Sequence, residues 1–197
     1  NIRLSSTDLE YIINHAGDRV IFADEDLLPL LEPLWGKIPC VELLVICRHG
    51  EGGESSFTNQ VNYEDFIADH PAAYDWPDIP ETAPMGLCYT SGTTGNPKGV
   101  MYTNRSTYLH TLTESLTDSM GLSALDSLLG IVPMFHAMGW GLPFAASMLG
   151  TKQVYPHRFM TSDSFLSLRV RVKTQEPKNQ MHASGLILFI FLASALR

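Results

Sequence analysis

The chain has 197 residues, of which 45 % are hydrophobic and 17 % charged, and its formal net charge at pH 7 is -8. This length and composition allow a buried core and exclude an intrinsically disordered chain. The negative charge argues against nucleic acid or an anionic membrane surface as a partner. The three cysteines form no C-x-x-C pair, which indicates reduced thiols in the cytoplasm or an organelle interior and a protein that is not secreted.

Residues 1–70 alternate helix and strand patterns. Apolar residues at helical spacing predict a helix over 9–16, with capping signals near Ser5 and a stop at Gly17. The apolar run 41–47 predicts a strand that is covered on both faces. Further elements are expected over 19–23 (strand), 26–35 (a helix interrupted by prolines), 48–60 (a surface loop) and 63–70 (a helix).

A proline-rich connector near 71–84 leads into a second run of elements. They are expected over 86–89 (strand), 104–120 (helix), 127–132 (strand), 137–149 (helix), 152–155 (strand) and 162–168 (the start of a helix). The first of these helices repeats Leu109, Leu112, Leu116 and Met120 at helical spacing. Strands that alternate with helices predict an α/β fold with a mostly parallel sheet and flanking helices.

The strongest functional signal is the segment 89–100, Tyr-Thr-Ser-Gly-Thr-Thr-Gly-Asn-Pro-Lys-Gly-Val. Its glycines let the backbone turn tightly, and its hydroxyls and one lysine are donors that a polyphosphate needs. A strand before the loop and a helix after it would place bound phosphates near a helix N-terminus. The loop is not a Walker A motif, because Pro97 precedes Lys98 and Gly99 stands where Ser or Thr is required. An ordinary surface turn is the alternative interpretation.

The complete string 89–100 closely resembles the signature loop of the adenylate-forming (AMP-binding) superfamily, and Pro133-Met-Phe-His-Ala137 resembles its next core motif. The segment Asn1-Ile-Arg-Leu-Ser5 resembles the fatty-acyl-CoA synthetase branch. The resemblance covers residues 1–168 and implies part of the large N-terminal domain of such an enzyme. Residues 169–197 depart from the pattern, so we expect an atypical tail that is not integrated into the α/β core.

The resemblance also implies a reaction and the residues that serve it. ATP activates a carboxylic acid as acyl-AMP, and CoA then takes up the acyl group as a thioester. The residues implied to bind the phosphates are Thr90, Ser91, Gly92, Thr93, Thr94, Gly95 and Lys98, with Thr90 as the Mg²⁺ contact. His136 is implied to lie beside the acyl carboxylate and the α-phosphate, as a catalytic and substrate-binding residue; a hydrogen-bonded structural histidine is the alternative. Trp140 is implied to gate the acyl tunnel, with plain core packing as the alternative.

The expected function is ATP-dependent activation of a fatty acid to acyl-CoA, with ATP, Mg²⁺ and CoA. The alternatives are an aryl- or amino-acid-activating ligase and a non-catalytic truncated product. The chain starts without Met and contains no Tyr-Gly pair, so the family's Y-G-x-T-E motif is absent and we expect a fragment that is inactive alone. Small-molecule substrates are the expected partners, and we allow for a homodimer of the full-length enzyme. Stable membrane insertion is not expected, because the apolar run 186–196 is too short to span a bilayer.

Overall fold

The computed structural model describes residues 1–50, 56–90, 95–156, 163 and 186–187. It confirms the predicted α/β class, with parallel sheets and helices. The chain divides into two compact units. Unit 1 comprises Asn1–Asp78 and Tyr89–Val100, and unit 2 comprises Ile79–Cys88 and Met101–Arg197. Each unit is described by itself.

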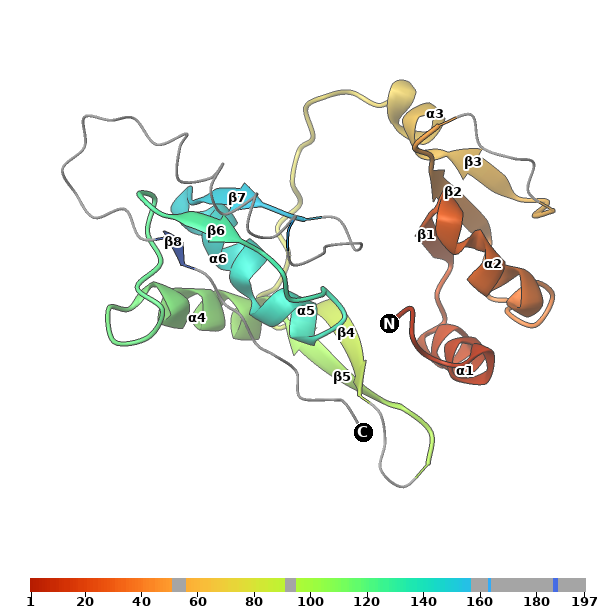
Figure 1. The fold of residues 1–197 in the computed structure, drawn as a ribbon, viewed down its shortest axis with the longest axis horizontal. Coiled ribbons are helices and arrows are strands. Elements are labelled where there is room, and N and C mark those ends of the chain that lie inside the picture. The colour runs from red at the N-terminus through yellow and green to blue at the C-terminus, as the bar shows by residue number, and fades with distance from the viewer. Residues whose placement is uncertain (51–55, 91–94, 157–162, 164–185, 188–197) are drawn as a thin grey trace. The chain divides into compact units, whose positions relative to one another are not determined.

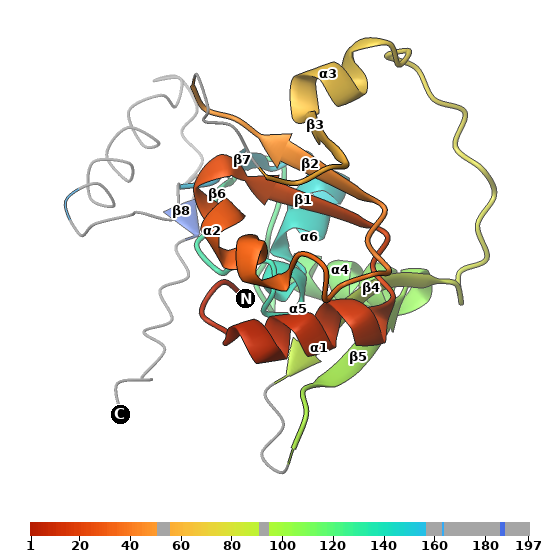
Figure 2. The same ribbon diagram turned by 90° about the vertical axis from the view of Figure 1, so that its right-hand side faces the viewer.

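Unit 1 is built on a three-stranded sheet in the order β1-β2-β3, in which both pairs of neighbours are parallel. Its elements are α1 (Ser6–Ala16), β1 (Val20–Asp24), η1 (Glu25–Leu27), α2 (Leu28–Leu31), η2 (Glu32–Leu34), β2 (Leu43–Cys47), β3 (Gln60–Asn62) and α3 (Tyr63–Ala68). Figure 1 labels them, and Figure 2 shows the three strands side by side. Leu44, Val45 and Ile46 in the central strand are completely buried, which confirms the prediction of a strand covered on both faces.

Both ends of α1 follow signals in its own sequence. At the N-terminus, Ser5 Oγ accepts a hydrogen bond from the Asp8 backbone N–H at 3.1 Å. At the C-terminus, Gly17 has a φ of 70°, and its N–H bonds to the carbonyls of Ile13 and Asn14. Ile13 is the buried residue of this helix. The predicted cap near Ser5 and the stop at Gly17 are therefore confirmed.

The stretch between β1 and β3 differs from the prediction in detail. The helix expected over 26–35 is a succession of short turns, η1, α2 and η2. Pro29 and Pro33 cause this, because each removes a backbone N–H that a continuous helix would need. The loop expected over 48–60 runs into the short strand β3, and residues 51–55 lie outside the described residues.

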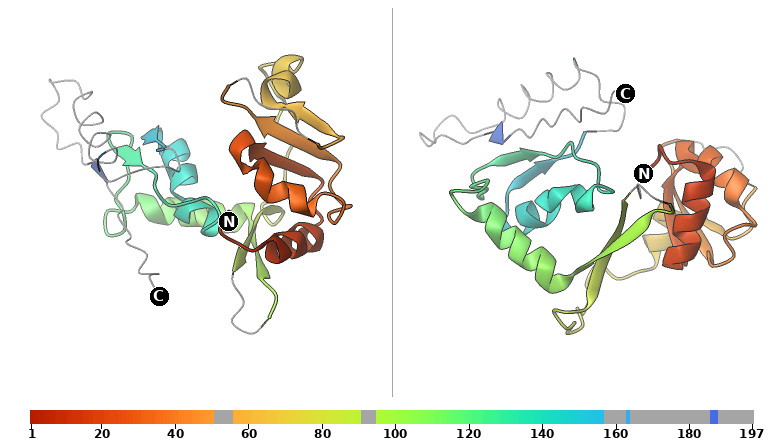
Figure 3. Two further views of the ribbon diagram at one scale, coloured as in Figure 1. Left: turned by 45° about the vertical axis from the view of Figure 1, so that its right-hand side comes forward. Right: turned by 90° about the horizontal axis from the view of Figure 1, so that it is seen from below.

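Unit 2 contains a second parallel sheet in the order β7-β6-β8. The strands β4 and β5 form a separate pair, and residues 89–90 and 98–100 of this pair belong to unit 1. The bounds are β4 (Pro84–Thr90), β5 (Lys98–Thr103), α4 (Asn104–Ser115), β6 (Ser127–Leu129), α5 (Ala137–Trp140), α6 (Leu142–Leu149), β7 (Lys152–Val154) and β8 (Leu186–Ile187). In unit 2, α6 lies between α4 and the strands β6 and β7 (Figure 3). The core here consists of Leu122, Leu128, Leu142, Ala145 and Ala146. None of the helices in the described part of the chain combines the length and apolar character needed to cross a bilayer.

The strand β8 lies inside the segment that we expected to stay apart from the core. Leu186 pairs with Ser127, and Ile187 pairs with Leu128, both in parallel register. At these two residues the tail therefore extends the sheet, and the expectation is wrong there. The rest of 169–197 and the helix start expected over 162–168, residue 163 excepted, lie outside the described residues.

The helix α4 buries a face that its leucines do not predict. Leu109 and Leu112 are 55 % and 39 % exposed, whereas Thr111 and Glu114 are only 3 % and 2 % exposed. The helix also ends at Ser115 and does not continue to residue 120. Its buried side is thus polar, and it faces α6.

Candidate functional site

The glycine-rich segment joins two paired strands, β4 and β5. The helix α4 begins only after β5, and its N-cap is Thr103, whose hydroxyl accepts the Ser106 N–H at 3.1 Å. The prediction of a strand, a loop and then a helix is therefore wrong, and the loop does not adjoin a helix N-terminus. Residues 98–100, which were expected in the loop, begin the strand β5 instead.

Three of the predicted phosphate-binding residues are described, and all three are exposed. Thr90 donates its hydroxyl to the Lys98 carbonyl oxygen over 3.5 Å, a long and weak contact. Gly95 has a φ of 150°, which favours glycine, and open space around it. Among the described residues, no hydrogen bond or ion pair holds the Lys98 ammonium. Ser91, Gly92, Thr93 and Thr94 lie outside the described residues.

Within unit 1, the first residue of the loop segment contacts α1. The Tyr89 hydroxyl lies 2.6 Å from His15 Nδ1 on α1, and the two rings meet edge to face. Burial, with smaller contributions from Tyr11 and Asp18, raises the pKa of Tyr89, so its phenol stays protonated at neutral pH. Sequence reasoning missed this contact, because 74 residues separate the two side chains.

In unit 2, the second motif forms a tight turn around His136. The His136 carbonyl accepts the N–H groups of Gly139 and Trp140 at 2.9 and 3.2 Å, and its own N–H bonds to the Pro133 carbonyl at 2.9 Å. The imidazole is exposed and packs against the Phe135 ring, with 4.6 Å between the ring centroids. His136 belongs to unit 2 and the loop to unit 1, so its predicted place beside the bound phosphates stays a prediction.

The helix predicted over 137–149 is interrupted near its start. Residues 137–141 all have positive φ, at 41°, 52°, 66°, 62° and 74°, and three of them are not glycine. A right-handed helix, α6, begins only at Leu142. Trp140 therefore lies on a left-handed turn, while Phe144 lies on α6. Such a conformation costs about 1–2 kcal/mol per non-glycine residue and requires tertiary contacts to hold it.

Trp140 is half-buried and lines a cavity of about 460 Å³ within unit 2. The cavity lies between β5, α4 and the left-handed turn, and Phe144 from α6 closes one side. Its wall is mainly apolar, and Thr107, His110 and Glu114 add polar groups to it. Whether Trp140 gates an acyl tunnel stays a prediction.

The most unusual group in this wall is the Glu114 carboxylate. It is 2 % exposed, and neither of its oxygens makes a hydrogen bond with a described residue. His110 Nε2 lies 3.3 Å from its Oε1. Burial raises the pKa of Glu114, and His110 opposes that rise only in part. Sequence reasoning missed this pair, although the four-residue spacing of His and Glu in a helix was a usable signal.

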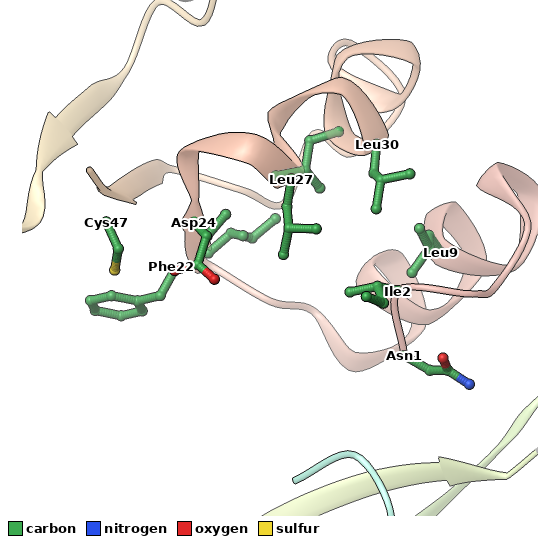
Figure 4. A pocket seen from close by; sticks show the side chains of 11 residues that line it. Asn1, Ile2, Leu9, Phe22, Asp24, Leu27, Leu30 and Cys47 are labelled. Carbon is green, nitrogen blue, oxygen red and sulfur yellow. The ribbon is translucent and has the colours of Figure 1, made fainter. Parts of the chain in front are cut away.

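Unit 1 has a separate cavity of about 300 Å³, shown in Figure 4. Ile2, Leu9, Leu27 and Leu30 give it an apolar wall, and Asp24 and Cys47 lie at one end. None of the predicted site residues lines it. Within the described parts of the chain, no three His, Cys, Asp or Glu side chains gather closely enough to hold a metal ion.

Comparison with known proteins places the sequence in a family. The profile of the AMP-binding enzymes, described as "AMP-binding enzyme", matches residues 1–175. This chain belongs to the AMP-binding enzymes. The resemblance to the adenylate-forming superfamily is thus confirmed, and the match extends seven residues beyond the expected end at 168.

Named relatives of this AMP-binding chain are CoA ligases. It is 44 % identical over 157 residues to a medium-chain-fatty-acid–CoA ligase of Ectopseudomonas oleovorans, covering 79 % of the chain and 29 % of the relative. It is 42 % identical over 156 residues to a long-chain-fatty-acid–CoA ligase of Thermus thermophilus, covering 79 % and 27 %. The chain thus spans less than a third of the length of these relatives.

Solved structures agree on the fold. The chain superposes on an anthranilate CoA ligase, AuaEII, in complex with anthranoyl-AMP, with a TM-score of 0.75 and 26 % identity over 88 % of the chain and 33 % of that structure. It also superposes on the N-terminal domain of FACL13 from Mycobacterium tuberculosis, with a TM-score of 0.71 and 20 % identity over 88 % and 40 %. The second likeness supports the fold alone.

Proposed function

We propose that the chain is part of an ATP-dependent fatty-acyl-CoA ligase and that residues 89–100 bind the phosphates of ATP. The strongest support is that Thr90 and Lys98, at the two ends of the loop, are exposed and have few internal contacts. The Lys98 ammonium is exposed and makes no ion pair with a described residue, and the Thr90 hydroxyl has only a long contact. A cation and a hydroxyl without strong internal partners are suited to bind anionic oxygens. The names of the relatives favour a CoA ligase over other adenylate-forming enzymes.

In the proposed reaction, a carboxylate oxygen of the acid bonds to the α-phosphorus of ATP, and the bond to pyrophosphate breaks. The sulfur of CoA then bonds to the acyl carbon, and AMP leaves. The first step depends on positioning and on neutralising phosphate charge. Lys98 and the loop residues Ser91, Gly92, Thr93, Thr94 and Gly95 would bind the oxygens of the leaving pyrophosphate.

A magnesium ion fits one residue at this site. Mg²⁺ usually takes one or two protein oxygens and completes its shell with substrate phosphates and water. The exposed Thr90 hydroxyl offers one such oxygen. When bound, the ion would neutralise phosphate charge, and Thr90 would fix its place at the start of the loop.

In unit 2, we propose that His136 binds the acyl carboxylate and that Trp140 contacts the acyl chain. His136 is exposed and does not line the cavity, whereas Trp140 does line it. The two residues would thus serve opposite ends of the acid. Residues 1–197 alone are proposed to be inactive, since the later family motif is not in the sequence.

A chimera tests this function. The aligned segment of the Ectopseudomonas ligase is replaced by that of this chain, and pyrophosphate release and acyl-CoA formation are measured with fatty acids, an aryl acid and an amino acid. We expect ATP- and CoA-dependent activity with medium- or long-chain fatty acids. A folded chimera that prefers the aryl or amino acid, or that is inactive while the parent is active, would overturn the proposal.

A further inference from the structure

Two side chains on α4 face the left-handed turn 137–141. His110 and Glu114 are four residues apart and therefore share one face of the helix. The Glu114 side chain is 3 % exposed, and the His110 side chain is 54 % exposed. The pair thus reaches from a buried carboxylate to an accessible imidazole, and both residues line the cavity.

The imidazole connects the carboxylate to the backbone of the turn. His110 Nε2 lies 3.0 Å from the Trp140 carbonyl oxygen and 3.3 Å from Glu114 Oε1. A carbonyl oxygen can only accept, so Nε2 carries the hydrogen and donates in the contact with Trp140. Negative charge on the nearby Glu114 carboxylate favours this same tautomer.

The turn needs such a contact. Ala137, Met138 and Trp140 all have positive φ, which is strained for residues with a side chain. Gly141 sits against the imidazole so closely that a Cβ at this position would lie 2.8 Å from His110 Nε2. A second close approach is at Gly86 in β4, where a Cβ would collide with the Met138 sulfur. The turn is therefore held from two sides.

We propose that His110, oriented by Glu114, is a positioning residue that fixes the left-handed turn through the Trp140 carbonyl and so sets the place of the Trp140 indole in the cavity wall. Glu114 acts through His110 and does not itself need to touch a ligand. The consequence for acyl binding rests on the proposed function, because Trp140 would contact the acyl chain. The structural part of the proposal does not depend on any activity.

The structural part is tested on the 197-residue chain by the indole ¹H–¹⁵N NMR signals. The chain has three tryptophans, and Trp140→Phe identifies the signal of Trp140. We expect His110→Leu to shift or broaden that signal while the signals of Trp35 and Trp76, both in unit 1, stay in place. His110→Gln, whose amide can still donate, should restore a single sharp Trp140 signal. Tyr108→Leu, an exposed ring on the same helix, is the matched control.

A Trp140 signal in His110→Leu that is identical to the unsubstituted one would overturn the proposal. If His110→Leu does not fold, His110→Asn provides the same test, because its shorter amide does not reach the carbonyl. An unchanged Trp140 signal in His110→Asn would then contradict the proposal equally.

The functional consequence is tested in the chimera. We expect His110→Leu to raise KM for the fatty acid by about five- to tenfold, the size of one ordinary hydrogen bond, and to leave KM for ATP unchanged. His110→Gln should restore the lower KM. Equal effects on both KM values would indicate a general structural role and contradict the proposal. A chimera without ligase activity would contradict the proposed function, but the NMR test would still decide the structural part of the proposal.

Discussion

The central strand of unit 1 and the helix α4 of unit 2 use their apolar residues in opposite ways. In β2, Leu44 and Ile46 are completely buried and belong to the core. In α4, Leu109 is more than half exposed, and the buried positions are Thr111 and Glu114. The sheet of unit 1 is thus stabilised by ordinary apolar burial, whereas α4 turns polar groups toward a cavity.

This difference indicates that β2 belongs to a structural core, whereas α4 borders a candidate site. Burying a carboxylate without a full set of hydrogen bonds costs free energy and is retained where the group has another role. The same region holds the strained turn 137–141. In unit 2, the buried carboxylate and the strained turn both lie near Trp140. The strand β2 of unit 1 has neither of these unfavourable features.

The largest expected effect contrasts the two regions directly. Leu44→Ala should lower the free energy of unfolding of unit 1 by about 2–5 kcal/mol, because the side chain is fully buried and its removal leaves a cavity. Leu109→Ala, the same chemical change on α4, should stay within about 0.5 kcal/mol. Native-state hydrogen exchange of β2 and α4 amides measures both. Equal losses at the two sites would contradict the contrast.

A smaller effect is expected from two glycines with nearly equal backbone angles. Gly17 and Gly141 have φ of 70° and 74°, but only Gly141 of these two lies against other side chains, those of His110 and Glu114. Gly17→Ala should cost about 1 kcal/mol through backbone strain alone. Gly141→Ala should cost about 2–3 kcal/mol, since strain and steric overlap add. Chemical denaturation of both variants checks this, and equal costs would contradict a steric contribution from His110 and Glu114.

The smallest effect concerns the charge of Glu114. Its raised pKa means that the folded protein still holds a proton at pH values where the unfolded chain has released it. Stability should therefore fall as the pH rises from 4.5, the ordinary value, through the raised pKa. His110 and Tyr102 are the other titratable groups in the cavity wall.

Glu114→Gln removes this pH dependence. The variant should be more stable than the unsubstituted chain by about 1 kcal/mol at neutral pH, and the difference should vanish near pH 4. Thermal unfolding at several pH values measures it. A difference that does not change with pH would mean that the carboxylate is not destabilised by burial.

Local signals in the sequence predicted the scaffold well. The strand β2 followed from a continuous apolar run, and α1 followed from its cap at Ser5 and its stop at Gly17. The AMP-binding motifs could also be recognised, because each is a short continuous segment of the sequence. All of these features are decided by residues that are neighbours in the chain.

The features that were not predicted correctly depend on contacts between residues far apart in the sequence. The strand β5 forms because β4 offers a partner, and the left-handed turn forms although Ala137 and Trp140 individually disfavour it. The buried face of α4 is set by α6, which begins 38 residues after Asn104. The pair His110 and Glu114 could have been found from its spacing, but its contact with the Trp140 carbonyl could not.

The central claim is that the loop 89–100 binds the phosphates of ATP, and Lys98 tests it most directly. In the chimera, Lys98→Ala should weaken MgATP binding or slow acid-dependent pyrophosphate release by roughly 1–3 kcal/mol, the loss of a charged hydrogen bond. Lys37→Ala, which removes another exposed lysine of unit 1, should change neither. Equal affinities and rates for Lys98→Ala, Lys37→Ala and the unsubstituted chimera would contradict the claim.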